Sequence, residues 1–166
     1  AFRVEAFCVD PEYMKCDVFN GKLVVPFDDS FVSRFPPTEY NLFVAMSYGE
    51  VNSVRRNKFL ECRRLGYRLA SYVSSKATVL NGEAIGENCF VLEDNTIQPF
   101  VRIGDNVTIW SGNHIGHHSL IKDHVFISSH VVVAGGVTIG EQCFIGVTAT
   151  LRDHINVGDR CVLGAD

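Results

Sequence analysis

The sequence predicts a mainly β protein built as a solenoid of short repeats, preceded by a small α/β unit. Its strongest feature is a set of aliphatic residues that recur every six positions with no insertion between them. The fifteen members are Val79, Ile85, Val91, Ile97, Ile103, Ile109, Ile115, Ile121, Ile127, Val133, Ile139, Ile145, Leu151, Val157 and Leu163. A period of about two residues indicates a strand and about 3.6 a helix, so this repeat indicates neither alone. Short repeats of fixed length bury their aliphatic side chains by stacking on their neighbours.

Two further positions of the repeat support this prediction. Glycine follows the aliphatic residue at Gly86, Gly104, Gly116, Gly140, Gly146, Gly158 and Gly164, where a tight corner favours a residue without Cβ. Two places before the aliphatic residue the chain mostly carries a small side chain, as at Ala77, Cys89, Ser119, Cys143, Ala149 and Cys161.

This pattern resembles the left-handed parallel β-helix of hexapeptide-repeat acyltransferases. In such proteins three hexapeptides make one triangular coil of about 18 residues. Residues 76–166 are therefore expected to form a left-handed β-helix of about five coils. The left hand comes from the resemblance, because right-handed crossovers dominate parallel sheets.

Residues 1–75 have a different pattern and are expected to form a small α/β domain with parallel strands. Strands are predicted at residues 3–9, 23–25, 42–46 and 67–73, and a helix at residues 50–65 that Gly66 stops. The helix carries Arg55, Arg56, Lys58, Arg63 and Arg64, which indicate a solvated face, with phosphate contact as the alternative. The sequence opens without Met and stops inside a repeat, so we expect it to be part of a longer protein.

Composition limits the classes of partner. The net charge is −4, which argues against a nucleic-acid partner. No apolar run reaches the roughly 18 residues of a membrane span, and no signal peptide opens the chain. The six cysteines form no C-x-x-C pair, so neither a zinc knuckle nor a redox motif is indicated. Cys89, Cys143 and Cys161 share one repeat position and are interpreted as small buried thiols, and a reducing cytoplasm fits.

Stacking every 18 residues makes neighbouring side chains predictable. Asn95 is expected beneath Asn113, and we interpret this inward amide pair as structural, because buried amides need hydrogen-bond partners. His117 is expected to point outward, one coil below Gly135. An outward imidazole beside an exposed backbone N–H suits acyl transfer from a thioester, since the base removes a proton and the N–H stabilises the oxyanion. The alternative is a solvated surface histidine without a catalytic role.

Two runs carry a more specific resemblance: WSGNHIGHHS at residues 110–119 and SSHVVVAGGVTIG at residues 128–140. They resemble the active-site coils of sugar acyltransferases typified by nucleotide-sugar N-acetyltransferases of the bacillosamine pathway and by sialic acid O-acetyltransferases. The likeness covers nearly the whole chain. It implies a homotrimer that uses acetyl-CoA, with coenzyme A bound in the groove between neighbouring β-helices.

The resemblance also implies roles for individual residues. His117 matches the catalytic base, and the Gly135 amide matches the group that holds the acetyl carbonyl. The coenzyme A groove corresponds to the segments around Phe126, Val147 and Ala165. The nucleotide-sugar site corresponds to Asp10, Met46 and Ser47.

The chain departs from that family in two places. The family usually has an acidic residue after the base, whereas this chain has His118, so His118 is itself a candidate base. The glycine-rich strand-to-helix turn that would approach the pyrophosphate is absent from these residues, so weak binding of the nucleotide is expected. Trp110, with Phe100, Phe126 and Val132, suggests an apolar outer face. We expect Trp110 at a subunit seam or acceptor wall, with packing against the N-terminal unit as the alternative.

The favoured function is transfer of acetyl from acetyl-CoA to an amino group of a nucleotide-linked amino sugar, without a metal. Sugar O-acetylation is the close alternative. A trimeric zinc carbonic anhydrase is a third, because His114, His117, His118, His124 and His130 lie close in sequence and imidazoles suit zinc. A non-catalytic β-helical scaffold is the fourth.

Overall fold

The computed structural model describes residues 3–80 and 85–165. The chain divides into two compact units, Ala1–Tyr40 and Asn41–Asp166. This division lies earlier than the expected boundary between residues 75 and 76. The physical reason is that residues 41–75 pair with and pack on the β-helical coils, as described below.

The first unit is a three-stranded sheet with a short helix. Strands β1 (Ala6–Val9), β2 (Val18–Phe19) and β3 (Lys22–Pro26) have the order β1-β3-β2, with β1 parallel to β3. Strands β2 and β3 pair antiparallel. The turn that joins them contains Asn20 and Gly21, both with positive φ, as the Asn-Gly pair predicts. A 3₁₀ turn (Pro11–Tyr13) and α1 (Phe31–Arg34) complete the unit, and Val25, Phe31 and Phe35 are buried.

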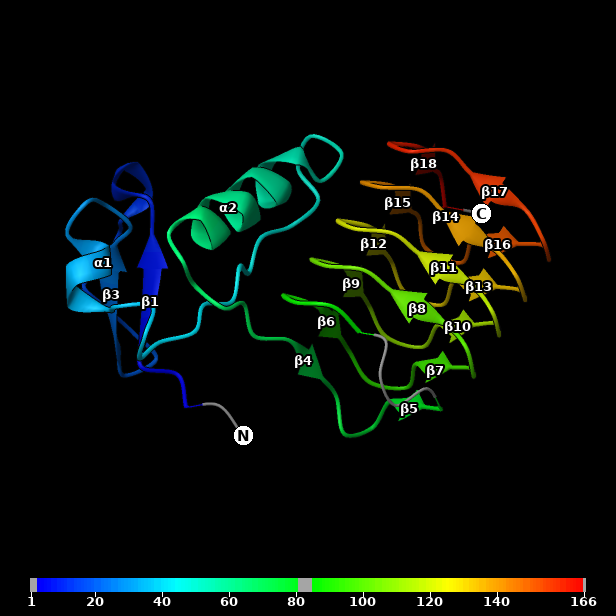
Figure 1. Cartoon of the computed structure of the whole chain (residues 1–166), viewed down its shortest axis with the longest axis horizontal. Helices are drawn as coiled ribbons and strands as arrows, with labels where there is room; N and C mark the ends of the chain where they lie inside the picture. Colours follow the sequence, from blue (N-terminus) through cyan, green and yellow to red (C-terminus); the bar gives the residue numbers. More distant parts are fainter. Residues whose placement is uncertain (1–2, 81–84, 166) are drawn as a thin grey trace. The chain divides into compact units, whose positions relative to one another are not determined.

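The second unit is dominated by fifteen two-residue strands wound into coils (Figure 1). They are β4 (Tyr72–Val73), β5 (Thr78–Val79), β6 (Phe90–Val91), β7 (Thr96–Ile97), β8 (Arg102–Ile103), β9 (Thr108–Ile109), β10 (His114–Ile115), β11 (Leu120–Ile121), β12 (Phe126–Ile127), β13 (Val132–Val133), β14 (Thr138–Ile139), β15 (Phe144–Ile145), β16 (Thr150–Leu151), β17 (Asn156–Val157) and β18 (Val162–Leu163). They form three parallel sheets, β16-β13-β10-β7-β5, β17-β14-β11-β8 and β18-β15-β12-β9-β6-β4. We call these the first, second and third sheets.

The register confirms the predicted stacking of residues 18 apart. Ile97 pairs with Ile115, Ile115 with Val133, and Val133 with Leu151. The repeated aliphatic residues form one continuous core, in which Ile109, Ile115 and most of the central members have no exposed surface. The predicted left-handed parallel β-helix of hexapeptide repeats is thus confirmed.

The corners of the coils explain the glycine pattern in more detail. The left-handed φ angles lie three residues after the aliphatic position, for example at Asn106, His118 and His130, rather than at the glycine directly after it. Glycine is needed directly after the aliphatic residue because the next coil approaches closely there. A Cβ on Gly116 would lie 2.5 Å from the carbonyl carbon of Ala134. The requirement is therefore steric and does not come from backbone conformation.

Residues 41–75 are incorporated into the coil stack. The predicted strands at 42–46 and 67–73 reduce to a parallel bridge between Leu42 and Leu69, and β4 pairs with β6 as part of the third sheet. The predicted helix is α2 (Ser53–Arg64), followed by Gly66 at φ 91°. Three residues with positive φ, Glu50, Val51 and Asn52, precede it and delay its start.

Helix α2 is attached to the coils by a buried cation, so the predicted solvated face is wrong for Arg55. Its side chain is 1% exposed, and burial lowers its pKa to about 10, which leaves it charged at neutral pH. Its guanidinium donates to the carbonyl oxygen of Asn106 at 2.7 Å and to those of His124 and Val125 at 3.2 Å. Three buried coil carbonyls therefore accept hydrogen bonds from one helix side chain.

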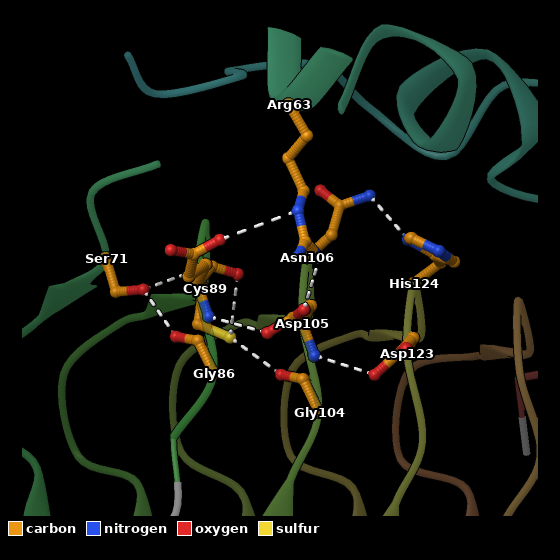
Figure 2. Close-up of polar contacts among 10 residues, drawn as sticks. Arg63, Ser71, Gly86, Cys89, Gly104, Asp105, Asn106, Asp123 and His124 are labelled. Atoms are coloured by element: carbon orange, nitrogen blue, oxygen red, sulfur yellow. Dashed lines mark hydrogen bonds and ion pairs between the residues drawn. The ribbon is translucent and has the colours of Figure 1, made fainter. Parts of the chain in front are cut away.

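A ladder of polar side chains lies beneath this helix. Asn88 donates to the side-chain carbonyl of Asn106 at 2.8 Å, and the Asn106 amide donates to His124 Nδ1 at 2.9 Å. Figure 2 shows the Asn106–His124 contact together with the ion pair between Arg63 and Asp105, in which Arg63 Nη1 is 3.1 Å from Asp105 Oδ2. Desolvation of the buried ring lowers the pKa of His124 to about 4, so this imidazole is neutral at pH 7.

Candidate active site

His117 and His118 lie at the corner between β10 and β11, where the chain passes from the first sheet to the second. Both side chains are exposed, as the sequence predicted for an outward pair. The backbone here is well fixed. The His117 N–H donates to Gln98 Oε1 at 2.9 Å, and the His117 carbonyl accepts from the Gly136 N–H at 2.8 Å.

The structure places the His117 ring against Gly135, one coil above. An ideal Cβ built on Gly135 would lie 2.7 Å from Cε1 and 2.8 Å from Nε2 of His117. Only glycine therefore allows the imidazole edge to lie this close to the backbone. Within residues 3–80 and 85–165, the Gly135 N–H donates no hydrogen bond to the protein. The His117 imidazole thus lies against Gly135, whose N–H has no protein acceptor among these residues.

His118 faces the opposite way. Its ring lies on Phe100, one coil below, with centroids 4.7 Å apart and planes tilted by 36°. Its Nδ1 is 3.0 Å from Nδ1 of His117, so the two imidazoles share one hydrogen bond. The two candidate bases therefore have different surroundings: His117 borders the unpaired backbone N–H, and His118 borders an aromatic ring and its neighbouring histidine.

The residues predicted for the coenzyme A groove lie elsewhere on the coils. Val147 and Ala165 occupy the corner between the third and first sheets and are exposed. Trp110, expected at a subunit seam or acceptor wall, lies exposed at the same corner. One edge of a coil separates this corner from His117. Because an edge spans about six residues at roughly 3.3 Å each, the separation is on the order of 15–20 Å. A single chain does not bring the two groups together.

Phe126 is buried in β12 and is only 5% exposed. Its ring packs on Tyr48 at 5.0 Å and on Phe144 at 5.7 Å, with Trp110 at 6.4 Å. The predicted apolar outer face is therefore not continuous, since Phe126 lies on the third sheet beneath Tyr48. Phe100, Trp110 and Val132 remain exposed, on or beside the first sheet.

The residues predicted for the nucleotide-sugar site fall in both units. Asp10 follows β1 in the first unit and is half-buried, with its carbonyl accepting from the Tyr13 N–H at 2.9 Å. Met46 and Ser47 lie in the second unit, exposed, in the segment before α2. Tyr48, the next residue, packs its ring on Phe126 and Phe144.

The predicted asparagine pair is structural. Asn95 Oδ1 accepts from the Asn113 backbone N–H at 2.9 Å, and Asn113 Oδ1 accepts from the Val131 N–H at 2.6 Å. Both side chains are buried, with exposed fractions of 1% and 2%. Each amide therefore links its coil to the backbone of the coil above.

Sequence reasoning missed the contributions of Gln98 and Phe100 to the histidine pair. Phe100 stands 18 residues before His118, so the stacking rule alone could have found it. Gln98 lies at the same corner one coil below His117, and its side chain accepts a hydrogen bond from the His117 backbone N–H. This contact is offset by one residue from the 18-residue spacing, so the stacking rule does not signal it.

The other clustered histidines lie apart from this pair. His124 is buried under α2, and His130 stacks over Gly112 at the corner that carries Trp110. Among the residues that the structure describes, no group of three or more His, Cys, Asp or Glu side chains is arranged to hold a metal ion. In the same residues, no helix has the length and apolar character that crossing a membrane requires.

Residues 84–117 and 118–153 match the family model described as Bacterial transferase hexapeptide (six repeats), so this part of the chain is similar to hexapeptide repeats of that type. A comparison with curated protein sequences finds no match.

Solved structures give more particular similarities. The acetyltransferase domain of PglB from Neisseria gonorrhoeae FA1090, in complex with acetyl coenzyme A, is 25% identical with a TM-score of 0.84 over 97% of this chain and 76% of that one. A variant of perosamine N-acetyltransferase from Caulobacter crescentus, in complex with CoA and GDP-perosamine, is 22% identical with a TM-score of 0.79 over 95% and 72%. WeeI from Acinetobacter baumannii AYE is 20% identical with a TM-score of 0.82 over 96% and 74%.

Proposed function

We propose that this protein is an acetyltransferase that moves the acetyl group of acetyl-CoA to the amino group of a nucleotide-linked amino sugar, in the synthesis of a surface polysaccharide or other glycan. The observation that carries the proposal is the His117 ring edge against Gly135, whose N–H donates no hydrogen bond to the described residues. The similarity to an acetyl-CoA-bound acetyltransferase domain and to an N-acetyltransferase bound to CoA and GDP-perosamine supports the donor and the acceptor class.

The geometry suits the following chemistry. The amino nitrogen of the sugar attacks the thioester carbonyl carbon, and a C–N bond forms while the carbonyl oxygen becomes anionic. The Gly135 N–H donates to this oxygen, where a backbone donor stabilises developing charge. His117 Nε2 takes the proton from the attacking nitrogen. The C–S bond then breaks, the proton passes to the sulfur, and the products are the amide and free coenzyme A.

His117, rather than His118, is the proposed base. Its Cε1–Nε2 edge lies against Gly135, the residue whose N–H is proposed to hold the oxyanion, so a thioester carbonyl at that N–H would bring the attacking amine towards His117. The His118 ring is turned away onto Phe100. A base must lie within hydrogen-bond reach of the proton that it removes, and position is considered before pKa.

The proposed active site is completed by a second copy of the chain. His117 and the proposed coenzyme A residues Val147 and Ala165 occupy different corners of one β-helix, on the order of 15–20 Å apart. Neighbouring β-helices in a homotrimer would place one chain's His117 corner against the next chain's Val147 corner. Exposed Val132, 42% accessible on the first sheet between these corners, fits such a seam. Phe126 would pack beneath the coenzyme A groove between the two chains without lining it, because the Tyr48 ring covers the Phe126 ring.

The acceptor is proposed to be bound outside the coils. The six-residue repeat continues without insertion from Val79 to Leu163, so no loop of the coils reaches over the histidines. Asp10, Met46 and Ser47 are the proposed contacts to the nucleotide sugar, and Trp110 the proposed wall of the acceptor site. The cysteine thiols fit a cytoplasmic location, where thiols stay reduced.

The test is release of coenzyme A thiol from acetyl-CoA with a panel of nucleotide-linked amino sugars and their hydroxyl counterparts. We expect release with an amino sugar and a raised melting temperature with acetyl-CoA, because a ligand of the folded state stabilises it. His117→Ala should lose about 10²–10⁴-fold in kcat and keep the melting shift. Reaction with the hydroxyl sugars alone would reassign the acceptor, and an inactive His118→Ala beside an active His117→Ala would reassign the base.

A further inference from the structure

The contact between the two histidines has a consequence for the proton on His117. The Nδ1 atoms are 3.0 Å apart, and a hydrogen bond between two imidazole nitrogens needs one N–H and one lone pair. Two arrangements are possible for neutral rings. Either His117 Nδ1–H donates to His118, which leaves a lone pair on His117 Nε2, or His118 donates, which places a proton on His117 Nε2.

Only the first arrangement leaves Nε2 of His117 able to accept a proton. That nitrogen is the one beside Gly135, 2.8 Å from the position of an ideal Cβ on that residue. We propose that His118 is a positioning residue that accepts the His117 Nδ1–H and thereby holds His117 in the tautomer with a free Nε2. This inference rests on the proposed function, because the base at Nε2 selects between the two arrangements.

The surroundings of His118 fit this role. Its backbone has φ 60°, and its N–H donates to the Pro99 carbonyl at 3.2 Å, which fixes where the side chain begins. The ring then lies on Phe100 at 4.7 Å between centroids, so stacking sets its plane. His118 is thus held from the coil below, while His117 contacts the coil above at Gly135. The hydrogen bond between the two Nδ1 atoms therefore connects a ring fixed by the coil below to a ring that contacts the coil above.

A histidine at this position differs chemically from an acidic residue. A neutral imidazole accepts the Nδ1–H and orients the ring, but adds no negative charge. A carboxylate or an amide oxygen could accept the same hydrogen bond, and Asp and Asn tolerate left-handed backbone better than most residues. The hydrogen bond and the aromatic stacking can therefore be separated by substitution at one position.

The experiment compares His118→Phe, His118→Asp and the control Arg160→Phe. Phenylalanine keeps a ring to stack on Phe100 and removes the acceptor, whereas aspartate restores an acceptor without the ring. We expect His118→Phe to lose about 10- to 100-fold in kcat, part of the roughly 10²–10⁴-fold that a positioned base contributes, with KM for acetyl-CoA unchanged. His118→Asp should recover to within about threefold. Arg160 has the same left-handed conformation at the exposed corner between the second and third sheets, and its variant should keep the wild-type rate.

The second readout is the ¹⁵N spectrum of the His117 ring, which needs no substrate. We expect the neutral wild-type ring to carry its proton on Nδ1, and His118→Phe to shift the population towards Nε2–H. A wild-type proton on Nε2, or a His118→Asp variant as slow as His118→Phe, would overturn the positioning role even if the enzyme acetylates amino sugars. A wild-type protein that releases no thiol with any acceptor would refute the proposed function instead, and the ring spectrum would still decide the tautomer.

Discussion

Substitution of Gly135 by alanine tests the central contact of the proposed site. An added Cβ would lie 2.7 Å from Cε1 and 2.8 Å from Nε2 of His117, whereas carbon atoms pack at about 3.5–4.0 Å. The exposed imidazole has to retreat by roughly 1 Å. A misplacement of about 1 Å costs on the order of 10²-fold in rate, which corresponds to about 2.7 kcal/mol in the activation free energy.

The assay is thiol release under saturating acetyl-CoA, with the melting temperature measured in parallel. Gly135→Ala should lose about 10²-fold in kcat and keep a melting temperature within a few degrees, because the exposed His117 ring can move without opening the core. The matched control is Gly158→Ala, whose new methyl group would meet only Cys161 Sγ at 3.8 Å. A Gly135→Ala enzyme with the wild-type kcat would refute the proposed role of this contact.

Three further variants test the packing that supports the site. Gly140→Ala should destabilise the fold by about 1–3 kcal/mol in urea unfolding, because its Cβ would lie 2.6 Å from the Asp159 backbone nitrogen. Asn113→Ala should cost about 1–3 kcal/mol, also in urea, since the buried Val131 N–H loses its acceptor. For His124, the folded pKa of about 4 lies below the unfolded value near 6.5, so the unfolded chain binds more protons between these pH values. The free energy of unfolding should therefore fall as pH drops from about 6.5 to 4, and His124→Gln should flatten this dependence.

Each of these expectations has a contrary result. Equal urea midpoints for Gly140→Ala and the uncrowded control Gly158→Ala would contradict the first, because they would show that the coils move apart at Gly140 at no measurable cost. An Asn113→Ala protein as stable as the wild type would mean that water or a neighbouring group satisfies the freed N–H. An unchanged pH dependence in His124→Gln would assign the acid sensitivity to other groups.

Much of the coil chemistry was predictable because a β-helix has a translational repeat. Residues 18 apart pair in register, so Asn95 beneath Asn113 and His117 beneath Gly135 could be predicted from spacing. The same rule failed for contacts between different parts of the chain. Arg55 was expected on a solvated helix face, yet it is buried against three coil carbonyls, because nothing in the helix pattern indicates which face meets the coils.

The sequence by itself determined the β-helix and the corner at which the histidines stand. A strict period of six allows one way to bury every aliphatic side chain, and that leaves little freedom in the register. The tertiary structure decided the directions of the two rings and the partners of α2. Both depend on side-chain rotamers and on packing between segments far apart in sequence, which no local pattern encodes. It also placed His117 and Val147 at different corners of one chain, which is why the proposed site needs a second copy.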